Sequence, residues 1–167
     1  MDAEAKKTTL RMIPYGLYIM TAKGKDGAVA AATVNWVTQT AFAPPIVVVG
    51  VKVGSGTYAV AKDAGAFALN MLGKGQQGPA FDFFKPAQLE GDKISGQPFR
   101  NGSTGAPILT AMPAAVECKL LEIVERGDHH IFVAEVVDAH LMQAPTGRPD
   151  AAILEMKELG EKVFYGG

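Results

Sequence analysis

One short segment, residues 52–57, combines a positive charge, two glycines and two hydroxyls in a spacing that suits an anion. It reads Lys-Val-Gly-Ser-Gly-Thr, after a β-branched run and before a helix-like stretch. The glycines let a ligand approach the backbone, and the free N–H groups of a helix's first turn favour negative charge. Lys52 adds charge, and Ser55 and Thr57 add hydroxyl donors. The segment predicts a phosphate cradle; the alternative is a plain helix cap at Ser55 beside a solvated Lys52.

A second segment places polar side chains and an indole along one strand-like stretch. Residues 30–32 are alanines, and Thr33, Asn35, Trp36 and Thr38 follow. A small-residue surface with a few polar groups suits an aromatic heterocycle. The alternative is that Trp36, the one tryptophan, is a core residue whose N–H is hydrogen-bonded.

A third segment carries an Asp-His-His sequence after a glycine. Asp128 can orient the ring of His129, which would create a histidine suited to acid–base or hydride chemistry. The alternative is a turn aspartate beside exposed histidines. His129 and His130 point to opposite faces if they lie on a strand, so they are poor joint metal ligands. His140 offers no zinc spacing and Cys118 is the single cysteine, so no metal site is predicted.

Composition limits the classes of protein that these segments serve. The chain has 167 residues, which predicts a single domain over 1–167. With 16 basic and 17 acidic residues its formal net charge is −1, which argues against nucleic-acid binding and a polybasic membrane anchor. The longest strongly apolar run, 46–51, is too short to span a bilayer. One cysteine and no signal peptide favour a cytoplasmic protein.

The elements that must position these residues are mostly short strands. Aromatic and β-branched runs between Gly and Pro signals are typical of strands, and Asp26-Gly27 predicts a hairpin turn. Helices are expected over 57–64 and near 76–84, and a long surface loop over 91–107. Strands are expected over 15–21, 28–39, 46–51, 67–72, 114–125, 130–143, 152–156 and 162–165. This pattern favours an antiparallel sandwich or barrel.

The order and spacing of these segments resemble the flavin reductase-like FMN-binding family, the split-barrel group that includes flavoredoxin. The resemblance runs from about Pro14 to Ala139. It rests on Thr33–Gln39, Phe42–Pro45, Lys52 with Ser55 and Thr57, Phe67–Asn70, Glu117-Cys118, Gly127–His129 and Glu135-Val136. The resemblance implies a mainly β fold, a six-stranded antiparallel Greek-key split barrel with short flanking helices. It also implies a homodimer with flavin at or near the subunit interface.

The resemblance further assigns the site residue by residue. The residues that would contact the flavin or shape its pocket are Thr33, Asn35, Trp36, Val37 and Thr38. Those that match the FMN phosphate positions are Lys52, Ser55 and Thr57. His129, oriented by Asp128, would lie near the flavin and the nicotinamide and act as the catalytic pair.

The implied function is an FMN-dependent oxidoreductase in which NADH or NADPH delivers hydride to flavin N5. Electrons would pass on to oxygen, free flavin, iron or a partner such as a monooxygenase or another redox protein. One alternative is a non-enzymatic FMN electron carrier or binding module that a partner protein reduces. A less favoured one is a ligand-binding dimer that has lost flavin. The sequence leaves open the acceptor, the choice of nicotinamide, and whether FMN is bound permanently or exchanges.

Overall fold

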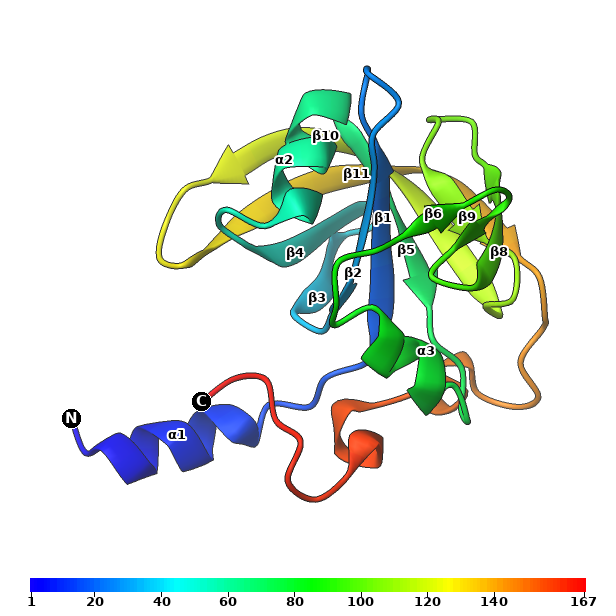
Figure 1. Cartoon of the computed structure of the whole chain (residues 1–167). Coiled ribbons are helices and arrows are strands. Elements are labelled where there is room, and N and C mark those ends of the chain that lie inside the picture. Colours follow the sequence, from blue (N-terminus) through cyan, green and yellow to red (C-terminus); the bar gives the residue numbers. More distant parts are fainter.

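A strongly curled antiparallel sheet forms the body of the molecule in the computed structural model, which describes residues 1–167 (Figure 1). Seven strands pair in the spatial order β2-β1-β5-β10-β11-β4-β3. They are β1 (Tyr18–Lys23), β2 (Val29–Val34), β3 (Val37–Ala41), β4 (Ile46–Lys52), β5 (Ala66–Met71), β10 (Ala114–Val124) and β11 (His129–Leu141). The mainly β, antiparallel class expected from the sequence is confirmed.

The two edge strands of this sheet, β2 and β3, are consecutive in the chain. β2 pairs with β1, while β3 pairs with β4 at the other edge. The link between them is only Asn35 and Trp36, so the sheet must curl until its edges nearly meet. The expected single strand over 28–39 is therefore wrong, because the chain breaks at Asn35 and Trp36 into two strands. The sheet has seven strands for this reason, rather than the six that the resemblance implies. The split between the edges is where the predicted site residues gather.

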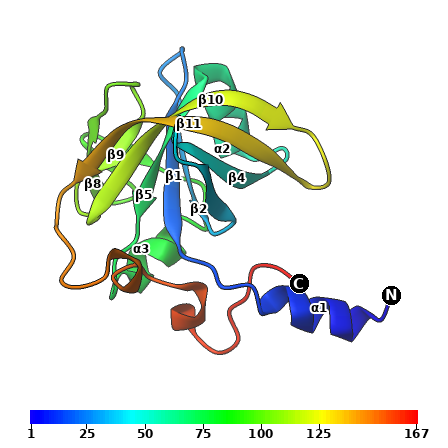
Figure 2. The same ribbon diagram turned by 180° about the vertical axis from the view of Figure 1, so that it is seen from behind.

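Three α-helices and two short 3-10 helices flank the sheet. The α-helices are α1 (Ala3–Arg11), α2 (Gly56–Ala64) and α3 (Gln77–Asp82), and the 3-10 helices are η1 (Pro149–Ala151) and η2 (Met156–Leu159). α2 and α3 lie at opposite ends of the curled sheet (Figure 1). Seen from behind, α1 and the C-terminus lie side by side below the sheet (Figure 2). None of the helices has both the length and the apolar character that a membrane crossing requires.

Two expectations for the irregular segments are wrong. Residues 91–107 are not one surface loop, because a small antiparallel sheet forms there from β6 (Leu89–Glu90), β7 (Lys93–Ile94), β8 (Gln97–Asn101) and β9 (Pro107–Leu109). The expected strands over 152–156 and 162–165 are absent. Ile153 and Glu155 make one isolated bridge each, and the reciprocal cap between Glu155 and Glu158 then turns the chain into η2.

The interior of the curled sheet is apolar and fully enclosed. Met20, Val49, Phe67 and Phe132 each have no exposed surface. Cys118 lies in the same cluster, and burial, with the neighbouring Glu117 carboxylate, raises the pKa of its thiol to about 12. Cys118 is therefore a structural buried thiol rather than a nucleophile.

One carboxylate, that of Glu117 on β10, is completely buried. It accepts hydrogen bonds from the backbone N–H groups of Ser103 (2.9 Å) and Thr104 (2.7 Å), the Thr104 hydroxyl and the His140 Nε2 (2.7 Å). A side chain at Gly102 would collide with this carboxylate. Burial by itself would raise the pKa of Glu117, but these hydrogen bonds outweigh it and lower the pKa to about 2. The charged carboxylate therefore fastens the 102–104 loop to the sheet.

Protonation of Glu117 should destabilise the fold. The pKa of Glu117 is lower in the folded than in the unfolded chain. Its contribution to the free energy of unfolding is therefore present above about pH 5 and is lost as the pH falls towards 2. Chemical denaturation from pH 7 to pH 2 should show this acid loss. Glu117→Gln should be less stable at pH 7 by roughly 2–3 kcal/mol and should show a shallower acid slope.

The exposed Glu161 offers a control, because Glu161→Gln should keep both the stability and the slope of the wild type. Equal acid slopes for Glu117→Gln and the wild type would contradict the assignment.

Candidate functional site

All ten predicted site residues line two adjoining cavities at the split of the sheet. The smaller cavity, of about 260 Å³, is lined by Thr33, Asn35, Lys52, Ser55, Thr57 and His129. The larger groove, of about 1150 Å³, is lined by Trp36, Val37, Thr38, Lys52, Asp128 and His129. The walls that both share are Gly50, Lys52, His129 and Tyr165. The predicted site residues, which lie between positions 33 and 129 of the sequence, are thus brought together around these two cavities.

The predicted phosphate cradle lies between the end of β4 and the start of α2. Ser55 is the N-cap of α2: its hydroxyl accepts from the Tyr58 N–H (3.1 Å) and donates to the Lys52 carbonyl (2.8 Å). The cap interpretation of Ser55 is therefore confirmed. The backbone N–H groups of Gly56 and Thr57 have no acceptor within the chain. These two N–H groups, rather than the Ser55 hydroxyl, are the free donors of this loop.

Lys52 and His129 are brought together by strand pairing. They are directly opposite each other in the β4–β11 register, and the Val53 N–H donates to the Asp128 carbonyl (3.0 Å). Lys52 is exposed and makes no ion pair. The loop thus combines an uncommitted positive charge with free N–H donors, beside the histidine.

The indole of Trp36 packs against a glycine of β4. The Gly50 N–H donates to the Trp36 carbonyl (2.9 Å), and a β-carbon at Gly50 would lie 3.0 Å from the indole Cε3. The Trp36 Nε1 is buried and has no hydrogen-bond partner. An unpaired buried donor is costly, which makes this N–H a candidate for a ligand's acceptor. Val37 and Thr38 continue along the groove, and the Thr38 hydroxyl donates to the Gln39 carbonyl.

The two polar side chains at the end of β2 and in the link are already engaged. The Thr33 hydroxyl donates to the Ala80 carbonyl of α3 (2.8 Å). The Asn35 side chain, only 4% exposed, donates from Nδ2 to the Tyr165 carbonyl (3.1 Å). Thr33 therefore joins the sheet to α3, and Asn35 joins it to the C-terminal segment.

Both ring nitrogens of His129 have a hydrogen-bond partner, one a carboxylate and the other a tyrosine hydroxyl. Its Nδ1 is 3.1 Å from Asp128 Oδ1, and its Nε2 is 2.7 Å from the Tyr165 hydroxyl. The carboxylate accepts the Nδ1 proton, so Nε2 accepts from the phenol. The hydrogen bond from His129, and the positive charge of this ring when it is protonated, lower the pKa of Asp128. Burial, and the charge of Asp128, raise the pKa of Tyr165, so the phenol remains a donor.

The neighbouring His130 faces the other side of the sheet, as expected for consecutive strand residues. Its Nδ1 lies 2.9 Å from the Tyr58 hydroxyl of α2. Tyr165, which completes the aromatic group, was missed by sequence reasoning. Its ring centroid lies 5.5 Å from that of Trp36 and 5.7 Å from that of His129. The one signal in the sequence is the Phe-Tyr pair at 164–165, which falls within the strand expected over 162–165.

A second polar cluster lies towards the other end of β11. Ligand-type atoms of Glu117, Asp138 and His140 lie within 4.8 Å of one another. The Glu117 oxygens already accept the hydrogen bonds described above, and Arg100 Nη2 lies 3.0 Å from His140 Nδ1. The guanidinium beside the imidazole favours an internal ion-pair network over a cation site.

The fold and this groove place the chain in a known class. Residues 10–154 match the family model described as the flavin reductase like domain, and the chain belongs to this family. The family resemblance expected from the sequence is thereby confirmed.

The chain is similar to several proteins that are named as reductases. The chain is 36% identical over 134 residues to the reductase component of a 4-nitrophenol 4-monooxygenase/4-nitrocatechol 2-monooxygenase from Rhodococcus opacus, covering 80% of this chain and 68% of the relative. It is 32% identical over 149 residues to a ferric-chelate reductase (NAD(P)H) from Archaeoglobus fulgidus, covering 86% and 83%. The structure of the styrene monooxygenase flavin reductase from Pseudomonas putida S12 superposes with a TM-score of 0.70 at 25% identity, covering 82% and 87%. The chain spans between 42% and 83% of the first four curated relatives.

Replacement of Gly50 should displace the indole of Trp36. In Gly50→Val the added side chain meets the ring, which must move at a cost of roughly 1–3 kcal/mol. Because Trp36 is the single tryptophan, its fluorescence emission reports the displacement directly. Gly78→Ala in α3, where nothing lies within 4 Å of an added methyl, should leave the emission unchanged. An unchanged spectrum in Gly50→Val would refute the packing argument.

Proposed function

We propose that this protein is a flavin reductase that binds FMN at the split of the sheet and takes electrons from NADH or NADPH. The observation that carries the proposal is the loop between β4 and α2. It presents the free N–H groups of Gly56 and Thr57 and the uncommitted Lys52 next to His129, in a chain of the flavin reductase family. An anion fits these donors, and the adjoining groove is large enough for a ring system.

FMN is proposed because the cradle suits a single phosphate. Lys52 and the N–H groups of Gly56 and Thr57 would hold the phosphate, with Ser55 fixing the loop that carries them. Lys52 and these N–H groups lie within one short loop, which is the size of a site for one phosphate group.

The remaining predicted residues would shape the ring pocket. The buried Trp36 N–H lacks an acceptor, and a heterocycle with carbonyl or ring-nitrogen acceptors supplies one. Thr33 and Asn35 would line the ring pocket from the smaller cavity, and Val37 and Thr38 from the larger groove.

The bound flavin supplies the two-electron redox chemistry, and the chain supplies binding and orientation. Asp128 holds the His129 ring in the wall of the groove that a nicotinamide would enter, where its Nε2 bonds to the Tyr165 hydroxyl. Phe83 and Phe84 line the smaller cavity. A nicotinamide donor is supported by the Archaeoglobus fulgidus relative, which is named as an NAD(P)H-dependent ferric-chelate reductase.

Two kinds of protein partner are proposed. A monooxygenase that uses the reduced flavin is supported by the names of the Rhodococcus opacus and Pseudomonas putida relatives. A second copy of the chain is supported by exposed apolar side chains along β10 and β11, including Leu121, Ile131 and Val137. The neighbouring Ile131 also lines the larger groove, so such an interface would adjoin the site.

An anaerobic absorbance titration of the FMN-loaded protein with NADH and then NADPH tests the proposal. Bleaching of the flavin band near one equivalent of either donor is the expected result. A band that resists both donors but bleaches with dithionite would favour the alternative, an electron carrier reduced by a partner protein.

Charge reversal at Lys52 should weaken FMN binding. The loss of one charge-assisted contact to a phosphate is worth about 1.5–3 kcal/mol, or roughly tenfold or more in the dissociation constant. Quenching of flavin fluorescence measures this for Lys52→Glu. Lys25→Glu, an exposed lysine in the β1–β2 turn, is the matched control and should bind FMN as the wild type does. Equal affinities for Lys52→Glu and wild type would sink the phosphate assignment.

Removal of the His129 ring should slow reduction more than it weakens FMN binding. His129→Ala takes away the imidazole that Asp128 orients in the groove, so stopped-flow reduction by NAD(P)H should be slowed by roughly 10²-fold. His130→Ala, on the other face of the sheet, should reduce at a rate near that of the wild type. An unchanged rate in His129→Ala would remove this residue from the mechanism.

A further inference from the structure

The polar groups that a flavin would use are already occupied by one residue of the chain itself. The Tyr165 carbonyl accepts from Asn35 Nδ2 at 3.1 Å, and the Tyr165 hydroxyl lies 2.7 Å from His129 Nε2. Its ring stands 5.5 Å from the Trp36 ring. Tyr165 therefore satisfies a buried amide and an imidazole that both face the proposed ligand.

Tyr165 also stands at the boundary between the two cavities. It lines both the smaller cavity and the larger groove, and Gly166 and Gly167 extend along the larger one. The segment that carries it, residues 163–167, runs from η2 back past the open end of the sheet to lie beside α1 (Figure 1). A ring system that filled both cavities would need the space of the Tyr165 side chain.

Besides the Tyr165 contacts to Asn35, Trp36 and His129 and the packing of Val163 against the core, the C-terminal segment 163–167 is held by exposed contacts. Arg11 Nε donates to the Gly166 carbonyl (3.2 Å), and the Arg11 guanidinium lies 4.3 Å from the centre of the Phe164 ring. Phe164 is 51% exposed and Tyr165 44%. α1 itself has no buried residue, so the anchor is weak as well.

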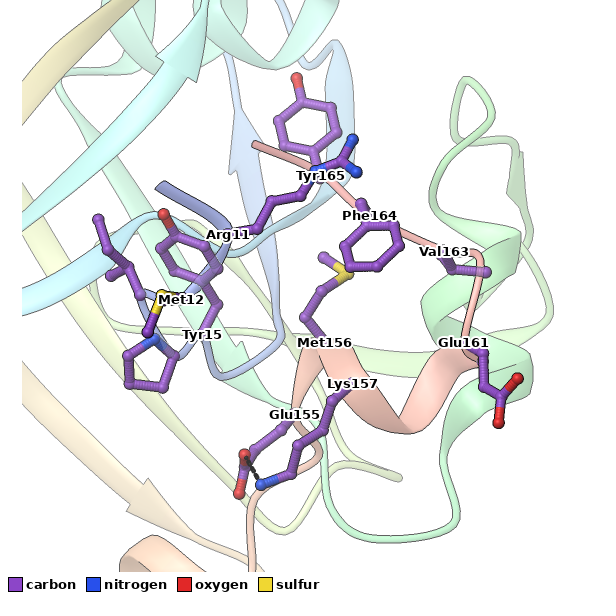
Figure 3. Close-up of a pocket in the computed structure, with 13 residues that line it drawn as sticks. Arg11, Met12, Tyr15, Glu155, Met156, Lys157, Glu161, Val163, Phe164 and Tyr165 are labelled. Carbon is purple, nitrogen blue, oxygen red and sulfur yellow. Dashed lines mark ion pairs between the residues drawn. The ribbon is translucent and has the colours of Figure 1, made fainter. Parts of the chain in front are cut away.

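A cavity with both apolar and charged walls lies beneath this segment. Met12, Tyr15, Met156 and Phe164 surround a space of about 500 Å³ (Figure 3). Since exposed hydrogen bonds and single cation–π contacts contribute little each, the cost of releasing the segment lies mainly in the contacts of Tyr165 and Val163.

We propose that Tyr165 is a displaceable placeholder that occupies the flavin site until FMN binds and thereby sets the affinity for FMN. The proposal rests on the proposed function, because FMN is the competing ligand. If Tyr165 were a fixed part of the pocket wall, its loss would not strengthen FMN binding. A displaceable Tyr165 and FMN exclude each other, so loss of the tyrosine strengthens FMN binding.

The test compares FMN dissociation constants for the wild type, Tyr165→Ala and Tyr165→Phe by quenching of flavin fluorescence. Tyr165→Ala removes the ring and its hydroxyl and should bind FMN about threefold to tenfold more tightly. Tyr165→Phe keeps the ring and the carbonyl but loses the contact to His129, so it should fall in between. Glu161→Gln, exposed and in contact with neither Asn35 nor His129, should match the wild type. Thermal unfolding of each variant checks that the fold is retained.

A second readout follows the segment itself without any activity. Chymotrypsin cuts after Phe164 or Tyr165 faster when the segment has left the groove, so saturating FMN should accelerate this cleavage in the wild-type protein, as followed by mass spectrometry. FMN that protects these bonds, or an FMN affinity in Tyr165→Ala that is unchanged or weaker, would overturn the placeholder while the proposed function stands. If no form of the protein binds FMN, the proposed function fails and the placeholder fails with it.

Discussion

The antiparallel pairing of β4 with β11 is the constraint on which the rest of the site depends. Its register sets Lys52 opposite His129, and the Val53 N–H continues the ladder to the Asp128 carbonyl. A shift of one residue would send the histidine to the other face, where His130 meets Tyr58. A loop that offers N–H donors and a histidine held by a carboxylate become neighbours because two strands hold them in register.

The curl of the sheet brings the other half of the site to these residues. With β2 and β3 at opposite edges, the two-residue link through Asn35 and Trp36 has to cross the split. Gly50 then admits the indole onto β4, where an added β-carbon would lie only 3.0 Å from the ring. The groove is therefore a consequence of how the barrel fails to close, and the polar groups at the split are left for a ligand or for the C-terminal segment.

The two ends of β11 show how the same residue types serve different purposes. Towards one end, His140 donates to a fully buried Glu117 whose remaining lone pairs are filled by backbone N–H groups and a hydroxyl, which fastens a loop. At the other end, His129 is held by an Asp128 that is 94% exposed, and its second nitrogen bonds to the hydroxyl of Tyr165, in the wall of a groove. A buried polar group whose atoms all have hydrogen-bond partners within the protein stabilises the fold. A polar group beside a cavity can instead exchange a partner for a ligand.

The amino-acid sequence by itself determined the antiparallel β class, the cap and free donors near 52–57, and the Asp128–His129 pair, because these depend on local patterns of residues. It did not determine the break at Asn35-Trp36 or the small sheet around 89–109, since strand ends depend on distant pairing partners. Nor did it predict Tyr165 in the site: that contact joins residues 36 positions apart, and only the packing of the C-terminal segment against α1 and the split sheet creates it. Local chemistry is encoded in neighbouring residues, whereas the assembly of a site is decided by which strands the folded chain brings side by side.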